Sequence, residues 1–228
     1  MNRIIVAAAM VSGLAFSAPA QAAVIYANDF ETASTADLSG GSIVTAPNGE
    51  NFYGYLSAGS AAVLTLTGLS GYANISLSFD LYTLESLDGD GLNCCGPDYF
   101  TVVAGSTTLL NETFSNVVGW QQSYGGSGSV GGTGSDSTLT GTLGYSYYGP
   151  DHTYHLSFAD IATSVSTLTI YFIGNSSQGW ADEGFGIDNL VVTGDLTDPN
   201  VVPVPAALPL LLTGLAGLGM LGRRRKAS

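Results

Sequence analysis

Three aspartates lie close together in one polar stretch of the sequence. The segment SLDGDGLNCCGPDYF contains Asp88, Asp90 and Asp98 between two strand-like runs. Carboxylates that converge without a basic partner must be solvated, spread apart or bridged by a cation, because like charges repel at short range. Oxygen-only ligands suit calcium, but the spacing is not that of an EF-hand, since Leu92 stands at the third ligand position and no Glu closes the loop. Asp-Gly pairs are also common in turns, and we prefer an ordinary turn to a calcium site here.

The two cysteines of the chain, Cys94 and Cys95, are adjacent and lie in the same stretch. In an exported protein they predict a vicinal disulfide, which would close a tiny ring and stiffen one loop tip. The alternative is a pair of free thiols that crosslink to other molecules. Zinc is not expected, because no second cysteine pair supplies the usual ligand spacing.

Aromatic residues surround a Gly/Ser-rich segment, residues 119–137, which reads GWQQSYGGSGSVGGTGSDS and predicts a mobile surface loop. Trp120, Tyr147 and Trp180 are the leading candidates for stacking on sugar rings, and Tyr124, Tyr145 and Tyr148 lie nearby in the sequence. Flat aromatic side chains cover the apolar faces of pyranoses at little entropic cost. The alternative, which we prefer, is that these aromatic residues fill the core.

Enzyme motifs are mostly absent. The sequence contains no GxSxG, HExxH or P-loop pattern. His152 and His155 would lie on opposite faces of a strand, so we expect two surface histidines and no shared site. The sequence does not exclude a pair of carboxylates that hydrolyses glycosidic bonds, because the distance between two such groups is set by the tertiary structure. We predict a non-enzymatic protein, with a glycan-active hydrolase or lyase as the alternative.

Charge is distributed very unevenly. The net charge is −13, all 18 acidic residues lie between residues 29 and 198, and the five basic residues are Arg3, Arg223, Arg224, Arg225 and Lys226. The central region therefore repels phosphate backbones, which excludes nucleic acid as an expected partner and makes cations the natural ones.

The central region reads as β-strands. Apolar and polar residues alternate over residues 75–81, 154–158 and 168–172, which is the period of half-buried strands. Further strand-like runs are residues 24–26, 63–66, 99–103, 138–143 and 187–193. Short strands with glycine-rich spacers predict an all-β domain over residues 23–196, an antiparallel β-sandwich of the jelly-roll type. A parallel β-helix is the rival, although no constant repeat is visible.

This body loosely resembles the jelly rolls of carbohydrate-binding modules and lectin-like domains. In such domains the first and last strands lie close together and often share a structural calcium ion. The resemblance implies that Asp29 and Glu31, from NDFE, and Asp188, from DEGFGIDNLVV, are calcium ligands with a structural role.

The N-terminus has the layout of a signal peptide, residues 1–22. Arg3 precedes an apolar run over residues 4–16, and residues 17–22 end in the small-x-small pattern that signal peptidase recognises. We expect cleavage after Ala22 or Ala23, and therefore export.

The C-terminus predicts a membrane span. Residues 206–222 carry no charge and, as a helix, would reach about 25 Å, slightly less than a hydrocarbon core of about 30 Å. The basic tail, residues 223–228, should stay in the cytoplasm by the positive-inside rule.

The segment VPVPAALPLLLTGLAGLGMLGRRRKA, residues 202–227, resembles the PEP-CTERM sorting signal of Gram-negative bacteria, particularly its VPLPA variant. At position 204 this chain has Val where the common motif has Glu and the variant has Leu. The resemblance implies an exosortase, an integral-membrane transpeptidase, that cuts near the linker and motif at residues 197–205. The protein would then pass from the inner membrane to the envelope, cell surface or extracellular matrix. There the sandwich is expected to bind polysaccharide or calcium, or to act structurally. The recognised residues would be Val202, Pro203, Val204, Pro205 and Ala206.

Overall fold

The computed structural model describes residues 22–32, 34–92, 95–162 and 165–197. The predicted sorting motif, membrane helix and basic tail lie outside these residues, and so does the predicted signal peptide except for Ala22. Within the described part of the chain, no helix is long and apolar enough to cross a membrane.

Strands account for nearly all regular structure in the described residues. In β12, and in β6 over residues 75–81, every second side chain is buried, because side chains of a strand point alternately to its two faces. One 3-10 helix, η1 (Leu69–Gly71), precedes β6. The strands are β1 (Ala22–Asn28), β2 (Leu38–Ser39), β3 (Ser42–Thr45), β4 (Asn51–Leu56), β5 (Ser60–Thr67), β6 (Tyr72–Glu85), β7 (Tyr99–Ala104), β8 (Thr107–Thr113), β9 (Gln121–Gln122), β10 (Ser129–Val130), β11 (His152–Ala162), β12 (Thr167–Asn175) and β13 (Glu183–Leu196).

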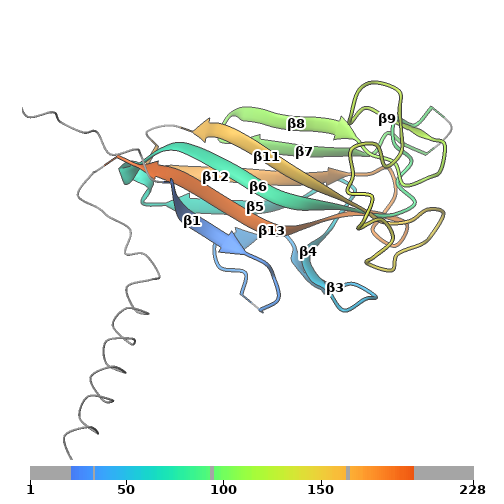
Figure 1. The fold of residues 1–228 in the computed structure, drawn as a ribbon, viewed down its shortest axis with the longest axis horizontal. Helices are drawn as coiled ribbons and strands as arrows, with labels where there is room; N and C mark the ends of the chain where they lie inside the picture. The colour runs from blue at the N-terminus through green and yellow to red at the C-terminus, as the bar shows by residue number, and fades with distance from the viewer. Residues whose placement is uncertain (1–21, 33, 93–94, 163–164, 198–228) are drawn as a thin grey trace, which may run out of the picture.

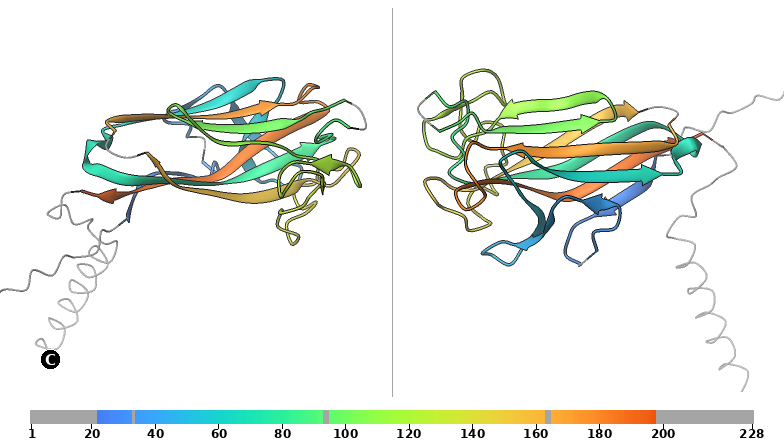
Figure 2. Two further views of the ribbon diagram at one scale, coloured as in Figure 1. Left: turned by 90° about the horizontal axis from the view of Figure 1, so that it is seen from above. Right: turned by 180° about the vertical axis from the view of Figure 1, so that it is seen from behind.

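Two antiparallel sheets make the body of the molecule (Figure 1). One has the order β11-β6-β13-β4-β3, with β1 also paired to β13, and the other has the order β2-β5-β12-β7-β8. Figure 2 shows the two layers stacked face to face. The predicted antiparallel β-sandwich is confirmed.

The connectivity of the sandwich is that of a jelly roll. Eight strands form four nested pairs, in which the earliest strand pairs with the latest one: β4 with β13, β5 with β12, β6 with β11, and β7 with β8. These nested pairs alternate between the two sheets, as a long hairpin does when it wraps around a core. The antiparallel pairing excludes the parallel β-helix.

Aromatic side chains fill the space between the sheets. Phe79 of β6 meets Phe172 of β12 edge to face, with ring centroids 5.0 Å apart, and Phe100 of β7 lies 5.2 Å from Phe185 of β13. All four side chains are buried. Such rings bury large apolar areas, so the two sheets form one stable platform for the loops at their ends.

The two ends of the sandwich differ. The chain enters and leaves at one end, where Ala22 pairs with Asp195. The β6–β7, β8–β11 and β12–β13 connections gather at the other end (Figure 1). A site built from these loops therefore lies far from the termini of the described domain.

The predicted strand at residues 138–143 is wrong. These residues form turns, because the Asp136 carboxylate accepts hydrogen bonds from the Thr138 N–H (2.8 Å) and the Thr138 hydroxyl (2.7 Å). The Leu139 N–H also donates to the Asp136 carbonyl (3.1 Å). A local aspartate turn thus outweighs the strand propensity of the sequence.

The Gly/Ser-rich segment at residues 119–137 contains the β9–β10 hairpin and is organised around Gln122, which is fully buried. The Gln122 side chain accepts from the Ser115 N–H (3.1 Å) and donates to the carbonyls of Tyr124 and Thr133, both at 3.0 Å. A buried amide thus attaches to the sandwich the segment that its composition predicted to be a mobile surface loop.

The two histidines lie on β11, and their exposure differs. His155 is exposed, as expected, but His152 is buried, so the surface position expected for it is wrong. The loop covers His152 closely: a Cβ atom added at Gly132 would come within 2.7 Å of the His152 ring. The Ser135 and Thr140 hydroxyls lie 3.3 and 3.4 Å from His152 Nδ1.

Candidate glycan pocket and acidic cluster

A pocket of about 340 Å³ opens at the loop end of the sandwich, and we call it the loop-end pocket. The connections that follow β6, β8 and β12 supply its walls. Its lining residues are Ser86, Asp88, Cys95, Val117, Trp120, Tyr147, Tyr148, Gln178 and Asp182.

Three aromatic side chains form the apolar part of this pocket. Trp120 is half-buried, whereas Tyr147 and Tyr148 are 52% and 71% exposed. The two tyrosine rings lie 4.5 Å apart at an interplanar angle of 67°. The Glu85 carboxylate accepts a hydrogen bond from the Tyr147 N–H (3.3 Å), which ties this tyrosine pair to the end of β6.

Of the three aromatic residues predicted to stack on sugars, the structure brings Trp120 and Tyr147 into one pocket. Trp180 does not line it. Instead, Trp180 stacks on Tyr55 with ring centroids 5.3 Å apart and remains 61% exposed. Tyr148, which follows Tyr147 in the sequence and was named there as a neighbouring aromatic residue, completes the pocket. Its exposure was not visible in the sequence, because a loop has no periodicity that separates buried from exposed positions.

Polar groups border the aromatic wall. Asp182 accepts a hydrogen bond from the Ser86 hydroxyl at Oδ1 (2.8 Å), and its carbonyl accepts the Ser86 N–H (2.9 Å). The Gln178 amide lies beside them and donates to Glu183 (3.2 Å). Rings with neighbouring carboxylate and amide groups can hold a polar ligand that also has apolar faces.

Asp88, Asp98 and Glu183 form an acidic cluster, and Asp88 also lines the pocket. One carboxylate oxygen from each residue lies within 4.8 Å of the others, and all three residues are buried. Asp98 accepts the Ser177 N–H (3.0 Å), and Glu183 accepts the Gln178 N–H (2.8 Å). No lysine or arginine occurs in the described residues, so the cluster has no basic side chain to neutralise it.

Burial and mutual repulsion hold protons on this cluster. Burial raises the pKa of Asp98 to about 6. Burial, reinforced by the Asp98 charge, raises the pKa of Glu183 to about 8. Near neutral pH the Glu183 carboxyl therefore keeps its proton, and a divalent cation bound here would replace that proton. The donors are all oxygens, which suits hard cations such as calcium.

The structure brings Asp88 and Asp98 together, as a calcium site in this stretch requires, but Asp90 does not belong to the acidic cluster. The Asp90 carboxylate instead accepts the Leu92 N–H (3.1 Å) in a local turn. The third member of the cluster, Glu183, was missed because it lies 85 residues further along the chain than Asp98. Only the position of β13 beside β6, where Glu183 pairs with Glu85, brings it close.

The second predicted calcium set is not brought together. The first and last strands do lie side by side, with Asn28 opposite Leu190. Even so, Asp29, Glu31 and Asp188 form no three-residue acidic group among the described residues. Glu31 binds the N–H and the amide of Asn51, at 3.0 and 3.2 Å. Asp29 borders a separate pocket of about 450 Å³.

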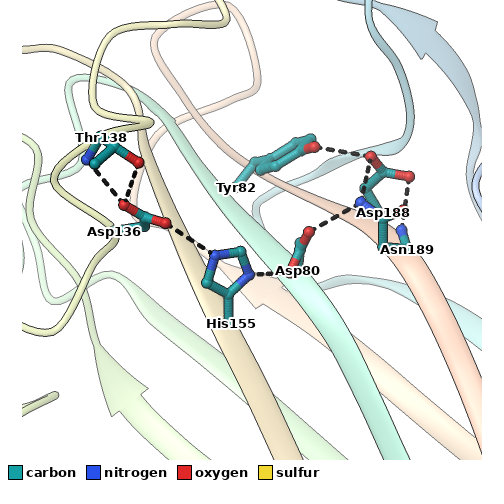
Figure 3. A network of polar contacts seen from close by, with 7 residues as sticks. All are labelled: Asp80, Tyr82, Asp136, Thr138, His155, Asp188 and Asn189. Atoms are coloured by element: carbon teal, nitrogen blue, oxygen red, sulfur yellow. Dashed lines mark hydrogen bonds and ion pairs between the residues drawn. The ribbon is translucent and has the colours of Figure 1, made fainter.

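Asp188 belongs to a polar network on the outer face of the sheet (Figure 3). Its carboxylate accepts the Tyr82 hydroxyl (2.8 Å), and burial raises its pKa to about 6. Asn189 continues the network to Asp80 (2.9 Å), which contacts His155 Nδ1 (2.5 Å). The contacts with Asp80 and, at 3.3 Å, with Asp136 raise the pKa of His155.

Cys95 lies on the rim of the loop-end pocket and is disulfide-bonded. Cys94 lies outside the described residues. The vicinal pairing of the two cysteines therefore stays a prediction.

Comparison with known proteins gives structural similarity only. No family model and no curated protein matches the chain. The chain is similar to dimeric latent PorU of Porphyromonas gingivalis, with 13% identity and a TM-score of 0.40, over 82% of this chain and 14% of that one. It is also similar to the CBM22-1 xylan-binding domain of Paenibacillus barcinonensis Xyn10C, with 13% identity and a TM-score of 0.40, over 79% and 100% of the two chains.

A third similar structure is the C-terminal CBM6 of the laminarinase LamC from Zobellia galactanivorans, with 12% identity and a TM-score of 0.37, over 77% and 100% of the chains. At these identities and TM-scores the similarities carry no functional argument. The fold assignment rests on the strand pairing, and the functional argument rests on the loop-end pocket.

Proposed function

We propose that this chain is an exported surface or matrix protein whose β-sandwich binds polysaccharide in the loop-end pocket. The observation that supports this is the joint presence of Trp120, Tyr147 and Tyr148 beside Asp182 and Gln178 in one pocket. Sugar rings have apolar C–H faces and a polar rim of hydroxyl groups. Aromatic faces match the first and carboxylate or amide groups match the second.

The proposal includes a structural calcium ion held by Asp88, Asp98 and Glu183. Such an ion would supply the positive charge that no side chain of the described domain provides, and its ligands would be carboxylate oxygens, which calcium prefers. Asp88 belongs both to the cluster and to the pocket lining. Calcium would therefore stiffen one wall of the pocket.

We propose binding without hydrolysis. Asp98 and Glu183 have the raised pKa values that catalytic acids need, but both are 0% exposed, so neither carboxyl can reach a glycosidic bond in this conformation. The raised pKa values follow from burial among like charges. A hydrolase or lyase would release new reducing ends from the bound polymer, which is a direct test of this point.

Export and sorting complete the proposal. The N-terminal signal peptide and the PEP-CTERM-like segment at residues 202–227 would send the protein across the inner membrane and then to an exosortase. Processing near residues 202–206 would release the acidic body to the cell surface or matrix, where polysaccharide is available.

Affinity electrophoresis of the purified full chain in gels that contain polysaccharides tests the binding site. We expect Tyr147→Ala to weaken retardation about tenfold, because an exposed aromatic platform is lost. Tyr171→Ala is the matched control, since Tyr171 is also exposed but lies on β12 outside the pocket. Equal loss in both variants, or no retardation of the wild type by any polysaccharide, would contradict the proposed function.

A further inference from the structure

We propose that the loop-end pocket selects polysaccharides that carry free amino groups, such as polymers with unacetylated glucosamine. This inference rests on the proposed function and adds a substrate class to it. It is carried by the combination, in one pocket, of exposed aromatic rings and carboxylates with no basic side chain near them.

The charges around the pocket have one sign. Asp182 and Asp88 line it, and Glu85 holds the Tyr147 backbone at its edge. None of the described residues is a lysine or arginine, so no described basic side chain neutralises Asp182 or Glu85, whereas the proposed calcium ion would offset the charge of Asp88. A pocket with this field attracts cationic ligands and repels uronate or sulfated sugars.

Asp182 has a free acceptor for an ammonium group. Its Oδ1 atom accepts the Ser86 hydroxyl, whereas Oδ2 accepts no hydrogen bond from the described residues. Asp182 is also partly exposed, unlike the buried Asp98 and Glu183. A protonated sugar amine can donate to this oxygen, which makes a charge-assisted hydrogen bond.

The aromatic rings add to the same preference. A cation over the face of a tyrosine or tryptophan is attracted by the quadrupole of the ring. Trp120, Tyr147 and Tyr148 line the pocket together with Asp182. An amino sugar can therefore stack its ring on one aromatic face and direct its ammonium group to the carboxylate, whereas an N-acetylated sugar keeps only the stacking.

Isothermal titration of the full chain in mild detergent at pH 6 tests the inference. The probes are oligomers of glucosamine and of N-acetylglucosamine with equal length. We expect the amine form to bind about tenfold more tightly at low salt, and this preference to shrink as salt screens the charges. It should also shrink as the pH rises above the pKa of the sugar amine.

Asp182→Asn is the decisive variant, because asparagine keeps the oxygen that accepts the Ser86 hydroxyl and removes only the charge. Asp160→Asn is the matched control. Asp160 is exposed on β11 near the Ala162–Ile75 pairing, at the opposite end of the strand from the pocket, and asparagine tolerates its positive φ of 53°.

Loss of the amine preference in Asp182→Asn alone supports the inference. Equal losses in Asp182→Asn and Asp160→Asn would show a diffuse charge effect and overturn it. Equal binding of the two oligomers by the wild type would also overturn it, while the proposed glycan binding would stand. If the wild type binds neither these oligomers nor any neutral polysaccharide, the proposed function itself fails.

Discussion

At the scale of single residues, Glu183 is a buried carboxyl group whose pKa is raised to about 8. It begins β13 and has no exposed surface. One of its carboxylate oxygens lies within 4.8 Å of carboxylate oxygens of Asp88 and Asp98. Two like charges at this distance in a buried site cannot both form at low cost. The cluster therefore has to hold a proton or a cation, and which of the two it holds depends on pH and calcium.

We predict that the calcium-free protein loses stability as the pH rises from about 4.5 to about 8. The pKa of Glu183 is about 8 in the folded state against 4.5 for an ordinary glutamate, so the folded state binds more protons across this range. The stabilising effect of the retained proton is complete below the lower pKa and disappears above the upper one. Thermal unfolding at pH 5 and pH 8 measures this, and we expect a loss on the order of a few kcal/mol.

Calcium should reverse the loss at pH 8, where the carboxylates are easiest to ionise. Glu183→Gln should flatten the pH dependence and remove the calcium response. Glu31→Gln is the matched control, because Glu31 belongs to the alternative calcium set and binds Asn51 instead. A calcium response that survives Glu183→Gln but disappears in Glu31→Gln would assign the ion to the other set.

At the scale of elements, the end of β12 lies close to the end of β4, which belongs to the other sheet, and to the β4–β5 turn. The Gly59 N–H donates to the Gly174 carbonyl (2.9 Å) at this point. A Cβ atom added at Gly174 would lie 2.3 Å from the Leu56 carbonyl oxygen, which belongs to the backbone and cannot rotate away. Glycine at this position therefore allows β12 and the end of β4 to lie this close together.

Gly174→Ala should therefore destabilise the domain by about 1–3 kcal/mol, because one of the two backbone segments must shift. Gly71→Ala is the control, since an added Cβ at Gly71 meets no atom within 4 Å, and it should change stability by no more than about 0.5 kcal/mol. Urea unfolding midpoints of the two variants make the comparison. Equal midpoints would show that the sheets can separate at this point without cost.

At the scale of the whole molecule, the termini of the described domain and the loop-end pocket lie at opposite ends of the sandwich. Ala22 and Asp195 pair at one end of the sandwich, while the loops that line the pocket lie at the other (Figure 1). A protein held through its C-terminus would thus present the pocket away from its point of attachment. The proposed sorting signal and the proposed binding site are spatially compatible in this arrangement.

If sorting follows the PEP-CTERM resemblance, the mature protein should end near residues 202–206 and lack the tail at 223–228. Intact-mass measurement of the protein from the cell surface or medium checks this. Replacing Pro203 and Pro205 with alanine should leave the tail in place, because the segment then loses the extended form that a protease requires. A wild-type surface protein that keeps residues 206–228 would contradict processing.

The sequence by itself determined the all-β class and most of the strands. Apolar alternation in β6, β11 and β12 is local information, since each strand has to bury one face whatever its partner is. Local sequence patterns gave the wrong prediction where hydrogen bonds of a side chain outside the main sheets determined the backbone conformation. Asp136 turned a predicted strand into turns, and the buried Gln122 organised a segment whose composition suggested mobility.

Only the tertiary structure decided which functional residues meet. Asp88 and Asp98 are neighbours in the sequence, but Glu183 joins them because β13 pairs with β6 across about one hundred residues of chain. Trp120 and Tyr147 line one pocket because the long β8–β11 connection folds over the end of the sandwich, whereas Trp180 stacks on Tyr55. A strand pattern specifies which face is buried, but strand order and loop packing are set by non-local contacts, and these place the charges and rings of the pocket.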